Sequence, residues 1–334
     1  MTPLRGLLVG TGGIARQAHL PAFLESQVAE RLQVVGTVDP YAREGPMTDV
    51  PHFSSLDDAH QLAPIDFIDI CTPTATHLEL AIRGLEAGYH VLCEKPVALS
   101  MEEVERLRAA RRPGQVIMAC HQYRHNPAWV TLRDWVDQGQ IGRWHLAELS
   151  VHRLGADQGE NAGSNGGLPW RARHADARGG ILLDHGTHLI YQVLDIAGMP
   201  QRVQCWTGRL RHGDYDVEDS AHLVLDYGDR AVLLFLTWSD DRRENRIRFV
   251  GSEGSAEWAG GTLRLENRSG VLTRDMSAEL AKSGYFRWFA ALFNHFADRI
   301  ARQDGVDALD DIARVTRILE AAYRSDAAGC RIDL

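Results

Sequence analysis

The first third of the chain alternates short apolar runs with segments of helical periodicity, and each apolar run has the length of a buried strand. The helix after the first run extends to about Glu30 and is interrupted near Pro21. Thr76 and Ser100 each stand three residues before a glutamate, the spacing of a capping box, and predict the starts of two later helices. Strands are predicted at residues 4–10, 32–39, 65–71, 89–94 and 116–120. This alternation predicts a doubly wound parallel sheet with helices on both faces.

After about residue 125 the pattern changes to repeated β-rich runs, which predict a large, open, mostly antiparallel sheet. These runs span residues 143–153, 201–211, 218–228, 230–239, 244–251 and 255–266. Helical periodicity returns at 128–138, 181–197, 285–302 and 308–325, and the aromatic stripe from Phe286 to Phe296 predicts core packing. The polar, glycine-rich segment 155–169 predicts a loop.

The two patterns together predict an α/β protein of two domains. Residues 1–124 are expected to form a Rossmann domain, and residues 125–334 an α+β domain whose final helix packs back on the first. A chain of 334 residues has the length of about two domains.

Composition excludes several classes of partner. The net charge of −9 argues against nucleic acid, which requires a concentrated basic face. No apolar stretch is long enough to span a membrane or to form a signal-peptide core. The five cysteines are odd in number and far apart, so we expect free thiols in a reducing, cytoplasmic compartment.

A nucleotide site is predicted where the first strand ends. Gly10-x-Gly12-x-x-Ala15 has the spacing of a dinucleotide-binding turn, which includes Gly13 and Ile14. Asp39 ends the second strand, where an acidic residue binds the ribose hydroxyls, so NAD(H) is preferred. Arg43 leaves NADP(H) open, and a glycine turn without any ligand is the alternative.

Four motifs in order resemble the Gfo/Idh/MocA oxidoreductases, relatives of glucose–fructose oxidoreductase and inositol dehydrogenase. The motifs are the glycine turn, Cys71-Thr72-Pro73-Thr74-Ala75-Thr76-His77, Glu94-Lys95-Pro96 and Gly180-x-x-x-Asp184-x-x-x-His188. The resemblance covers nearly the whole chain. It implies a substrate-binding C-terminal domain and homodimers or homotetramers built through its sheet.

The residues of these motifs suggest hydride-transfer chemistry. Lys95 follows a parallel strand, where ligands of such sheets bind, and its ammonium can stabilise an alkoxide. His188 can exchange a hydroxyl proton near neutral pH, and Asp184, four residues before it, can orient the imidazole or bind a substrate hydroxyl. Packing roles are the alternatives. A metal site of Asp184, His185 and His188 lacks a clear further ligand, so no metal is expected.

Other site residues rest on the resemblance. It implies a cis Lys95–Pro96 bond and places Thr72, Pro73 and Glu94 with Lys95 at the cofactor, while His77 is either a contact or a helix-cap residue. It also implies that Gln122, Tyr123, Arg124, Trp170 and Arg171 line the substrate site, and surface packing is the alternative for Trp170.

We therefore expect an NAD(P)-dependent dehydrogenase or reductase acting on a CH–OH group of a sugar, cyclic polyol or related ring. One alternative is a dinucleotide sensor without catalysis, because the fold of this family also occurs in a yeast galactose co-repressor. A metal-dependent hydrolase is a third possibility, and it requires bound metal.

Overall fold

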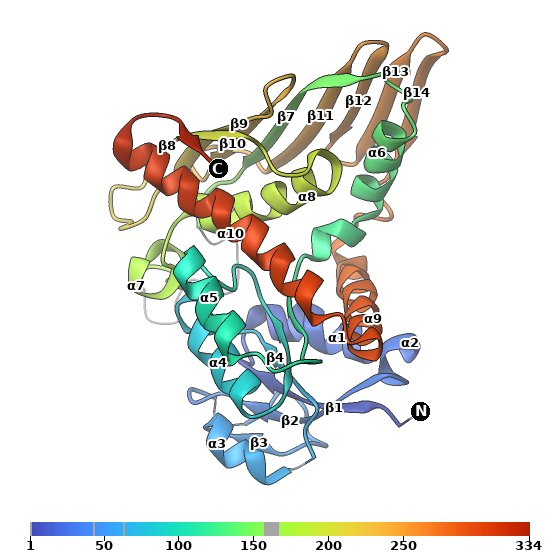
Figure 1. Ribbon diagram of the computed structural model, residues 1–334. Coiled ribbons are helices and arrows are strands. Elements are labelled where there is room, and N and C mark those ends of the chain that lie inside the picture. The colour runs from blue at the N-terminus through green and yellow to red at the C-terminus, as the bar shows by residue number, and fades with distance from the viewer. Residues whose placement is uncertain (1, 43, 63, 157–166) are drawn as a thin grey trace. The chain divides into compact units, whose positions relative to one another are not determined.

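The computed structural model describes residues 2–42, 44–62, 64–156 and 167–334 (Figure 1). Arg43 and most of the predicted loop at 155–169 lie outside the described residues. The chain divides into two compact units, residues 1–122 with 283–313 and residues 123–282 with 314–334. The sequence predicted that residues 125–334 form the second domain, whereas segment 283–313 groups with the first unit.

The first unit contains a six-stranded sheet, and all of its strand pairs are parallel. The order β3-β2-β1-β4-β5-β6 is that of a doubly wound sheet, which confirms the prediction. The strands are β1 (Leu4–Val9), β2 (Leu32–Val38), β3 (His52–Phe53), β4 (Phe67–Ile70), β5 (His90–Cys93) and β6 (Ile117–Ala119).

Helices cover both faces of this sheet because successive strand residues point to opposite sides. Leu7 and Ile68 belong to one apolar cluster, which includes residues of α4 (His77–Glu86) and α5 (Met101–Ala110). Leu8 and Phe67 belong to the other, with α1 (Leu20–Phe23), α2 (Ser26–Ala29) and α9 (Phe286–Arg302). Figure 1 shows α4 and α5 side by side.

The aromatic stripe of α9 explains why residues 283–313 return to the first unit. Phe289, Phe293 and Phe296 are fully buried, which confirms the prediction of core packing. Phe293 lies 4.5 Å from the ring of Phe23, measured between centroids, and Phe296 lies 5.9 Å from that of Phe67. α3 (Leu56–Ala59) and the start of α10 (Gly305–Ala328) complete this unit.

The second unit contains a nine-stranded sheet in the order β14-β13-β12-β11-β7-β10-β9-β8-β15. Its neighbours are antiparallel except for the parallel pair of β7 and β10, so the prediction of a mostly antiparallel sheet is confirmed. The strands are β7 (Trp144–His152), β8 (Arg202–Gly208), β9 (Ser220–Asp226), β10 (Ala231–Thr237), β11 (Glu244–Gly251), β12 (Gly254–Ala259), β13 (Thr262–Asn267), β14 (Gly270–Asp275) and β15 (Ile332–Asp333).

One face of this sheet is covered by helices and the other is more open. In β10, Val232, Leu234 and Leu236 are buried, while Leu233 and Phe235 on the opposite face are more exposed. Figure 1 shows α6 (Pro127–Asp137), α7 (His174–Ala177) and α8 (Thr187–Ala197) within this unit, and α6 contacts β12 and β13. A π-helical turn (Leu182–Gly186) leads into α8 and contacts β10.

Several local predictions were wrong. The run 255–266 is two strands, because Gly260 and Gly261 form a turn between β12 and β13. Thr76 does not cap α4, because a 3₁₀ turn precedes the helix and its hydroxyl donates back to Thr72 Oγ1 and Pro73 O. Ser100 does cap α5 through Glu103 N, as predicted.

The first helical segment also differs from its prediction. Residues 13–23 are continuously helical and include the π-helical turn Ala15–His19 and α1, so Pro21 does not interrupt the helix. The break falls after Phe23 instead. Pro21 therefore lies inside a continuous helical segment, directly after its π-helical turn.

Two expectations about the chain as a whole are addressed by the described residues. In the ranges given above, no helix combines the length and apolar character that crossing a membrane requires. All five cysteines are free thiols, and Cys330 is the exposed one.

Candidate active site

The glycine turn after β1 has the geometry that a bound pyrophosphate requires. Gly10 adopts a φ of +89°, and a Cβ there would lie 2.8 Å from the backbone carbon of Cys71, so only glycine fits. A Cβ on the exposed Gly12 would have no heavy atom within 4 Å, so the space beside it is open to a ligand. Ala15 is fully buried, as close packing of the helix on the strand requires. The turn therefore fits a dinucleotide.

Asp39 is held against this turn. Thr11 donates both its backbone N–H and its hydroxyl to Asp39 Oδ2 at 2.9 Å, and Tyr41 N donates to Oδ1 at 2.9 Å. Burial alone would raise the pKa of Asp39, but these hydrogen bonds outweigh burial and lower it. The result is a fixed carboxylate at the position where Rossmann domains bind ribose hydroxyls.

Replacing Gly12 with alanine is expected to weaken NADH binding at least about tenfold without destabilising the protein, since a Cβ there meets only the ligand. Fluorescence titration of NADH and thermal unfolding measure the two effects. Gly10→Ala is the matched control and should lower the melting temperature, because its Cβ meets the chain itself. Unchanged NADH affinity in Gly12→Ala would show that no phosphate lies against Gly12.

Two loops at the carboxyl ends of β4 and β5 carry the other predicted cofactor residues of the first unit. Thr72 and Pro73 are accessible, Lys95 is half-buried, and the Lys95–Pro96 bond is cis, as predicted. His77 is 1% exposed, and its ring nitrogens lie 2.8 Å from Pro96 O and Thr72 O. The His77 ring therefore ties the two loops together, and is neither a helix cap nor accessible to a ligand.

A buried charged cluster lies beneath these loops. His19 Nδ1 is 2.7 Å from Asp69 Oδ2, and its Nε2 is 3.1 Å from Glu94 Oε1. When both acids are ionised, each ring nitrogen donates to a carboxylate, which is the hydrogen-bonding pattern of an imidazolium. Burial lowers the pKa of His19, but the charge of Asp69 and its hydrogen bond outweigh burial and raise it well above its usual value.

Glu94 therefore faces inward and does not extend toward a ligand. Its Oε1 contacts His19 and its Oε2 accepts from Lys95 N at 3.2 Å. The predicted cofactor contact of Glu94 thus becomes a support for the backbone of Lys95. His19 and Asp69 were not predicted from the sequence, although an aspartate inside the apolar run of β4 indicates a buried partner.

This cluster predicts a pH dependence of stability. Because the pKa of His19 is raised on folding, its contribution is fully present below the unfolded pKa of about 6.5 and is lost as pH rises through the folded pKa. The melting-temperature difference between wild type and His19→Gln should therefore shrink as pH rises from neutral. A difference that stays constant to pH 10 would mean that the folded ring is neutral. His145→Gln, at an exposed position on β7, is the control.

In the second unit, His188 is fixed by two tyrosines. Tyr191 Oη lies 2.9 Å from His188 Nδ1 and accepts from Tyr123 N at 3.1 Å. The rings of Tyr123 and His188 have centroids 4.5 Å apart. The structure thus brings the predicted residues Tyr123 and His188 together. Tyr191 was not predicted from the sequence, although it stands three residues after His188, a helical spacing at which side chains meet.

Asp184 belongs to a second polar group. Its Oδ2 lies 3.4 Å from Arg171 Nε and 3.2 Å from His185 Nδ1. The guanidinium of Arg171 stacks 4.4 Å from the ring of Trp170, so the predicted aromatic and cationic pair is formed. Asp184 precedes His188 through a π-helical turn rather than a regular α-helix, so the predicted spacing of one α-turn does not apply.

Two predicted substrate residues have structural partners. Gln122 is 2% exposed and donates through Nε2 to Tyr285 Oη in the first unit. Arg124 pairs with Asp195 at 2.9 Å, and its guanidinium lies 5.3 Å from the ring centroid of Tyr191. Arg124 therefore supports Tyr191, which anchors His188.

Buried groups of metal-ligand type occur among the described residues, although none was expected from the sequence. His19, Asp69 and Cys71 form one, and His19, Glu94 and Cys120 another. His19 belongs to both groups. Its Nδ1 contacts Asp69 and Cys71, and its Nε2 contacts Glu94. The expected absence of metal stays a prediction.

Comparison with known protein families finds two matches that together span most of the chain. Residues 4–121 match the oxidoreductase family with an NAD-binding Rossmann fold. Residues 129–257 match the GFO/IDH/MocA C-terminal domain. The first match covers the sheet of the first unit, and the second covers most strands of the second unit's sheet.

The sequence identities with individual relatives are low, between 20% and 29% for the three described next. D-glucoside 3-dehydrogenase of Escherichia coli (strain K12) is 24% identical, over 100% of this chain and 98% of its own length. The scyllo-inositol 2-dehydrogenase (NADP(+)) of Bacillus subtilis (strain 168) is 29% identical, over 58% of this chain and 51% of its own. A crystal structure of an oxidoreductase from Agrobacterium radiobacter, with NAD+, L-tartaric acid and magnesium, has a TM-score of 0.84 at 20% identity, covering 99% of this chain and 98% of its own.

Proposed function

The chain belongs to the GFO/IDH/MocA family of oxidoreductases, and we propose that it transfers a hydride between nicotinamide C4 and a secondary alcohol or ketone. The substrate class is a sugar, a cyclic polyol or a related hydroxylated ring, which is the class in the names of two relatives. The observation that carries the proposal is the anchored His188, because an imidazole held by Tyr191 is suited to exchange a hydroxyl proton.

Each reactive residue has one role in this proposal. His188 is the acid/base, with Tyr191 as its orienting partner at Nδ1, so that Nε2 is the nitrogen that exchanges the proton. Lys95 holds the substrate oxygen and stabilises its developing negative charge as hydride leaves. Asp184, with Arg171 and Trp170, binds substrate hydroxyls or orients the imidazole.

The cofactor is bound by the first unit. NAD(H) supplies or accepts the hydride, and the residues proposed to hold it are Gly10, Gly12, Gly13, Ile14, Asp39, Thr72, Pro73 and Lys95. The carboxylate of Asp39 would receive two ribose hydroxyls and repel a 2′-phosphate. We therefore propose a preference for NAD(H) over NADP(H), although one relative is named for NADP(+).

Asp39→Ala should reduce this preference at least about tenfold, measured as the ratio of the dissociation constants of NADPH and NADH. The loss of charge repulsion is expected to tighten NADPH binding, while the loss of ribose hydrogen bonds weakens NADH binding. Asp49→Ala, at an exposed position before β3, is the control. An unaltered ratio in Asp39→Ala would show that Asp39 does not bind the ribose hydroxyls.

The assembly is proposed to be a homodimer or homotetramer formed through the open sheet face. Trp206 is 44% exposed and Phe235 45%, and His222 lies between their rings, with centroids 5.3 and 4.7 Å away. An apolar strip of this kind on a sheet face is typical of a surface that a second subunit covers.

A sensor that binds the dinucleotide without catalysis is the second candidate. The presence of Lys95, Asp184 and His188 together favours the enzyme. The test is nicotinamide absorbance with purified protein, NAD+ or NADP+, and a panel of inositols, aldoses and sugar acids. Formation of NADH with one ring type supports the enzyme. The sensor is favoured if no panel compound changes the absorbance with NAD+ or NADP+, and the matching keto compounds also do not react with NADH. NADH must still bind to the protein in that case.

A further inference from the structure

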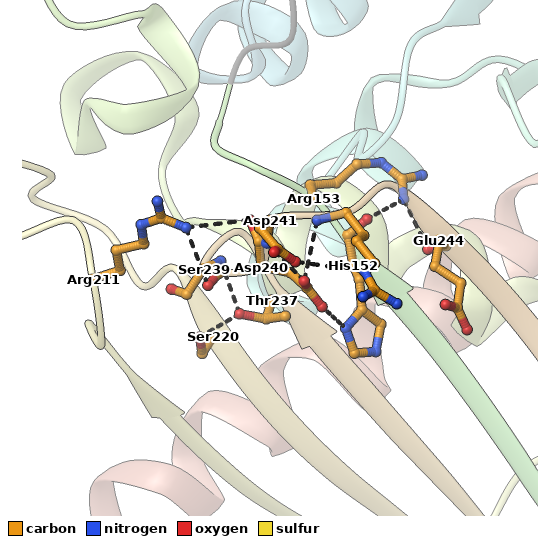
Figure 2. Close-up of polar contacts among 10 residues, drawn as sticks. His152, Arg153, Arg211, Ser220, Thr237, Ser239, Asp240, Asp241 and Glu244 are labelled. Carbon is orange, nitrogen blue, oxygen red and sulfur yellow. Dashed lines mark hydrogen bonds and ion pairs between the residues drawn. The ribbon is translucent and has the colours of Figure 1, made fainter.

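Arg153 is a buried cation at the carboxyl end of β7, and its side-chain hydrogen bonds go only to neutral oxygens. It is 3% exposed. Nη1 donates to His152 O at 2.7 Å and to Glu244 O at 3.0 Å, and Nη2 donates to Asn245 Oδ1 at 2.7 Å. Figure 2 shows the guanidinium beside His152 and Glu244 at the ends of their strands. Two peptide carbonyls and one amide fix its position without neutralising its charge.

The remaining donors of Arg153 form a fork. A guanidinium has five N–H groups, and the three contacts above use both on Nη1 and one on Nη2. Among the described residues, no oxygen accepts from Nε, and no carboxylate lies within ion-pair distance of Arg153. Nε–H and the second Nη2–H are neighbouring donors, the arrangement that binds both oxygens of a carboxylate.

The surroundings of Arg153 disfavour its positive charge, so an anion bound there would stabilise it. His152 pairs with Thr237 of β10 and with Glu244 of β11, so the next residues outward, Trp238 and Arg243, flank Arg153 in the sheet. Burial, and then the like charge of Arg243, lower the pKa of Arg153 to about 10. At this end of the sheet Asp240 Oδ2 lies 2.6 Å from His152 Nδ1, and it forms no ion pair with Arg153 (Figure 2).

Arg153 also belongs electrostatically to the site of His188. The charges of Tyr123 and Asp184 both act on Arg153, and Tyr123 stacks on His188. Asp184 contacts Arg171 and His185, at 3.4 and 3.2 Å, rather than neutralising Arg153 in direct contact. Trp238 follows the end of β10, and its Nε1 is buried without a hydrogen-bond partner among the described residues. Arg153 is thus linked to the candidate acid/base through Tyr123, whose ring stacks on His188.

We propose that Arg153 binds a carboxylate of the substrate, so that this site takes a sugar acid or another hydroxylated acid in preference to a neutral sugar. This inference rests on the proposed function, whose substrate site it refines. A buried guanidinium bound only by neutral oxygens is costly, and an anionic ligand removes that cost when it binds. A carboxylate offers two oxygens to the two remaining donors of Arg153.

Matched substrates test the proposal on the wild-type protein. Glucuronate and glucose, galacturonate and galactose, and the corresponding 6-phosphates are compared by kcat/KM with NAD+. We expect the acids to be preferred by roughly 10- to 100-fold, the usual range for a charge-assisted hydrogen-bonded pair. Equal use of acid and neutral partners overturns the proposal, and preference for the phosphates overturns the assignment to a carboxylate.

Variants then assign the preference to one residue. Arg153→Met should lower kcat/KM for the acid by the same factor and leave that for the neutral sugar nearly unchanged. Arg153→Lys keeps the charge but loses the fork, and should fall between the two. Arg211→Met is the matched control, since Arg211 is exposed at the same end of the sheet and also donates to backbone carbonyls (Figure 2). A preference that persists in a folded Arg153→Met overturns the proposal.

If the protein is not an oxidoreductase, the carboxylate site can still be tested by binding. If no compound is turned over although NADH binds, calorimetric titration of the protein–NADH complex with glucuronate replaces kinetics. Binding of glucuronate but not glucose, lost in Arg153→Met, supports the carboxylate site, and absence of glucuronate binding overturns it. If Arg153→Met does not fold, Arg153→Lys and the wild-type preference decide between the same outcomes.

Discussion

Replacing His188 with asparagine is expected to lower kcat by about 10²- to 10⁴-fold, the usual contribution of a general acid/base. Asparagine keeps a polar side chain but cannot exchange a proton near neutral pH. Tyr191 would keep a partner of similar polarity at the position of Nδ1, so the fold should change little. Since His188 is in the second unit, NADH affinity and melting temperature should remain close to those of wild type.

The control for this prediction is His145→Asn, at an exposed position on β7. Tyr191→Phe separates orientation from proton transfer, because it removes the anchor and leaves the imidazole. That variant should lose less activity than His188→Asn, because the imidazole that exchanges the proton is still present. If His188→Asn turns over as fast as wild type, another group performs the proton transfer.

Replacing Lys95 with methionine is expected to lower kcat/KM by roughly 10²- to 10³-fold, the cost of removing one donor to a developing oxyanion. Lys95 is one of only two lysines in a chain that otherwise uses arginine for its positive charge. A compact ammonium can approach a single oxygen in a way that a planar guanidinium cannot, so Lys95→Arg should not restore activity. NADH binding should weaken far less than kcat/KM falls, because Lys95 is one of several proposed cofactor contacts and the glycine turn and Asp39 are unchanged.

Lys282→Met is the matched control, because Lys282 is exposed and is the other lysine of the chain. With two lysines, amine-selective labelling resolved by mass spectrometry also reports on Lys95 directly. Substrate should protect Lys95 from labelling and leave Lys282 unaffected. Full activity in Lys95→Met, or labelling of Lys95 that substrate does not reduce, would contradict its role at the substrate oxygen.

Local patterns were sufficient to predict most of the fold. The parallel sheet followed from apolar runs alternating with helices, and the nucleotide turn from two glycines whose steric surroundings the structure makes explicit. The hydrophobic stripe of α9 predicted burial correctly but not its location, because periodicity gives the buried face and not the surface it packs against. Periodicity alone therefore could not show that segment 283–313 groups with the first unit.

The supporting contacts of the site could not be predicted, because they join residues far apart in the sequence. His19 meets Asp69 and Glu94 across 50 and 75 positions. Arg153 is held by Glu244 and Asn245, about 90 positions away, and only the register of β7 with β11 brings them together. Tyr191 was within reach of sequence reasoning, since it shares a helix with His188.

Transfer of a deuterium label tests the central claim, hydride transfer to nicotinamide C4, most directly. The protein is incubated with NAD+ and a mixture of carbon-deuterated inositol, glucose and glucuronate, and the dinucleotide is analysed by mass spectrometry. The account predicts reduced dinucleotide one mass unit heavier than NADH with wild type, and none with His188→Asn. A protein that binds NADH but forms no labelled product from any component, at any pH from 6 to 10, would contradict it.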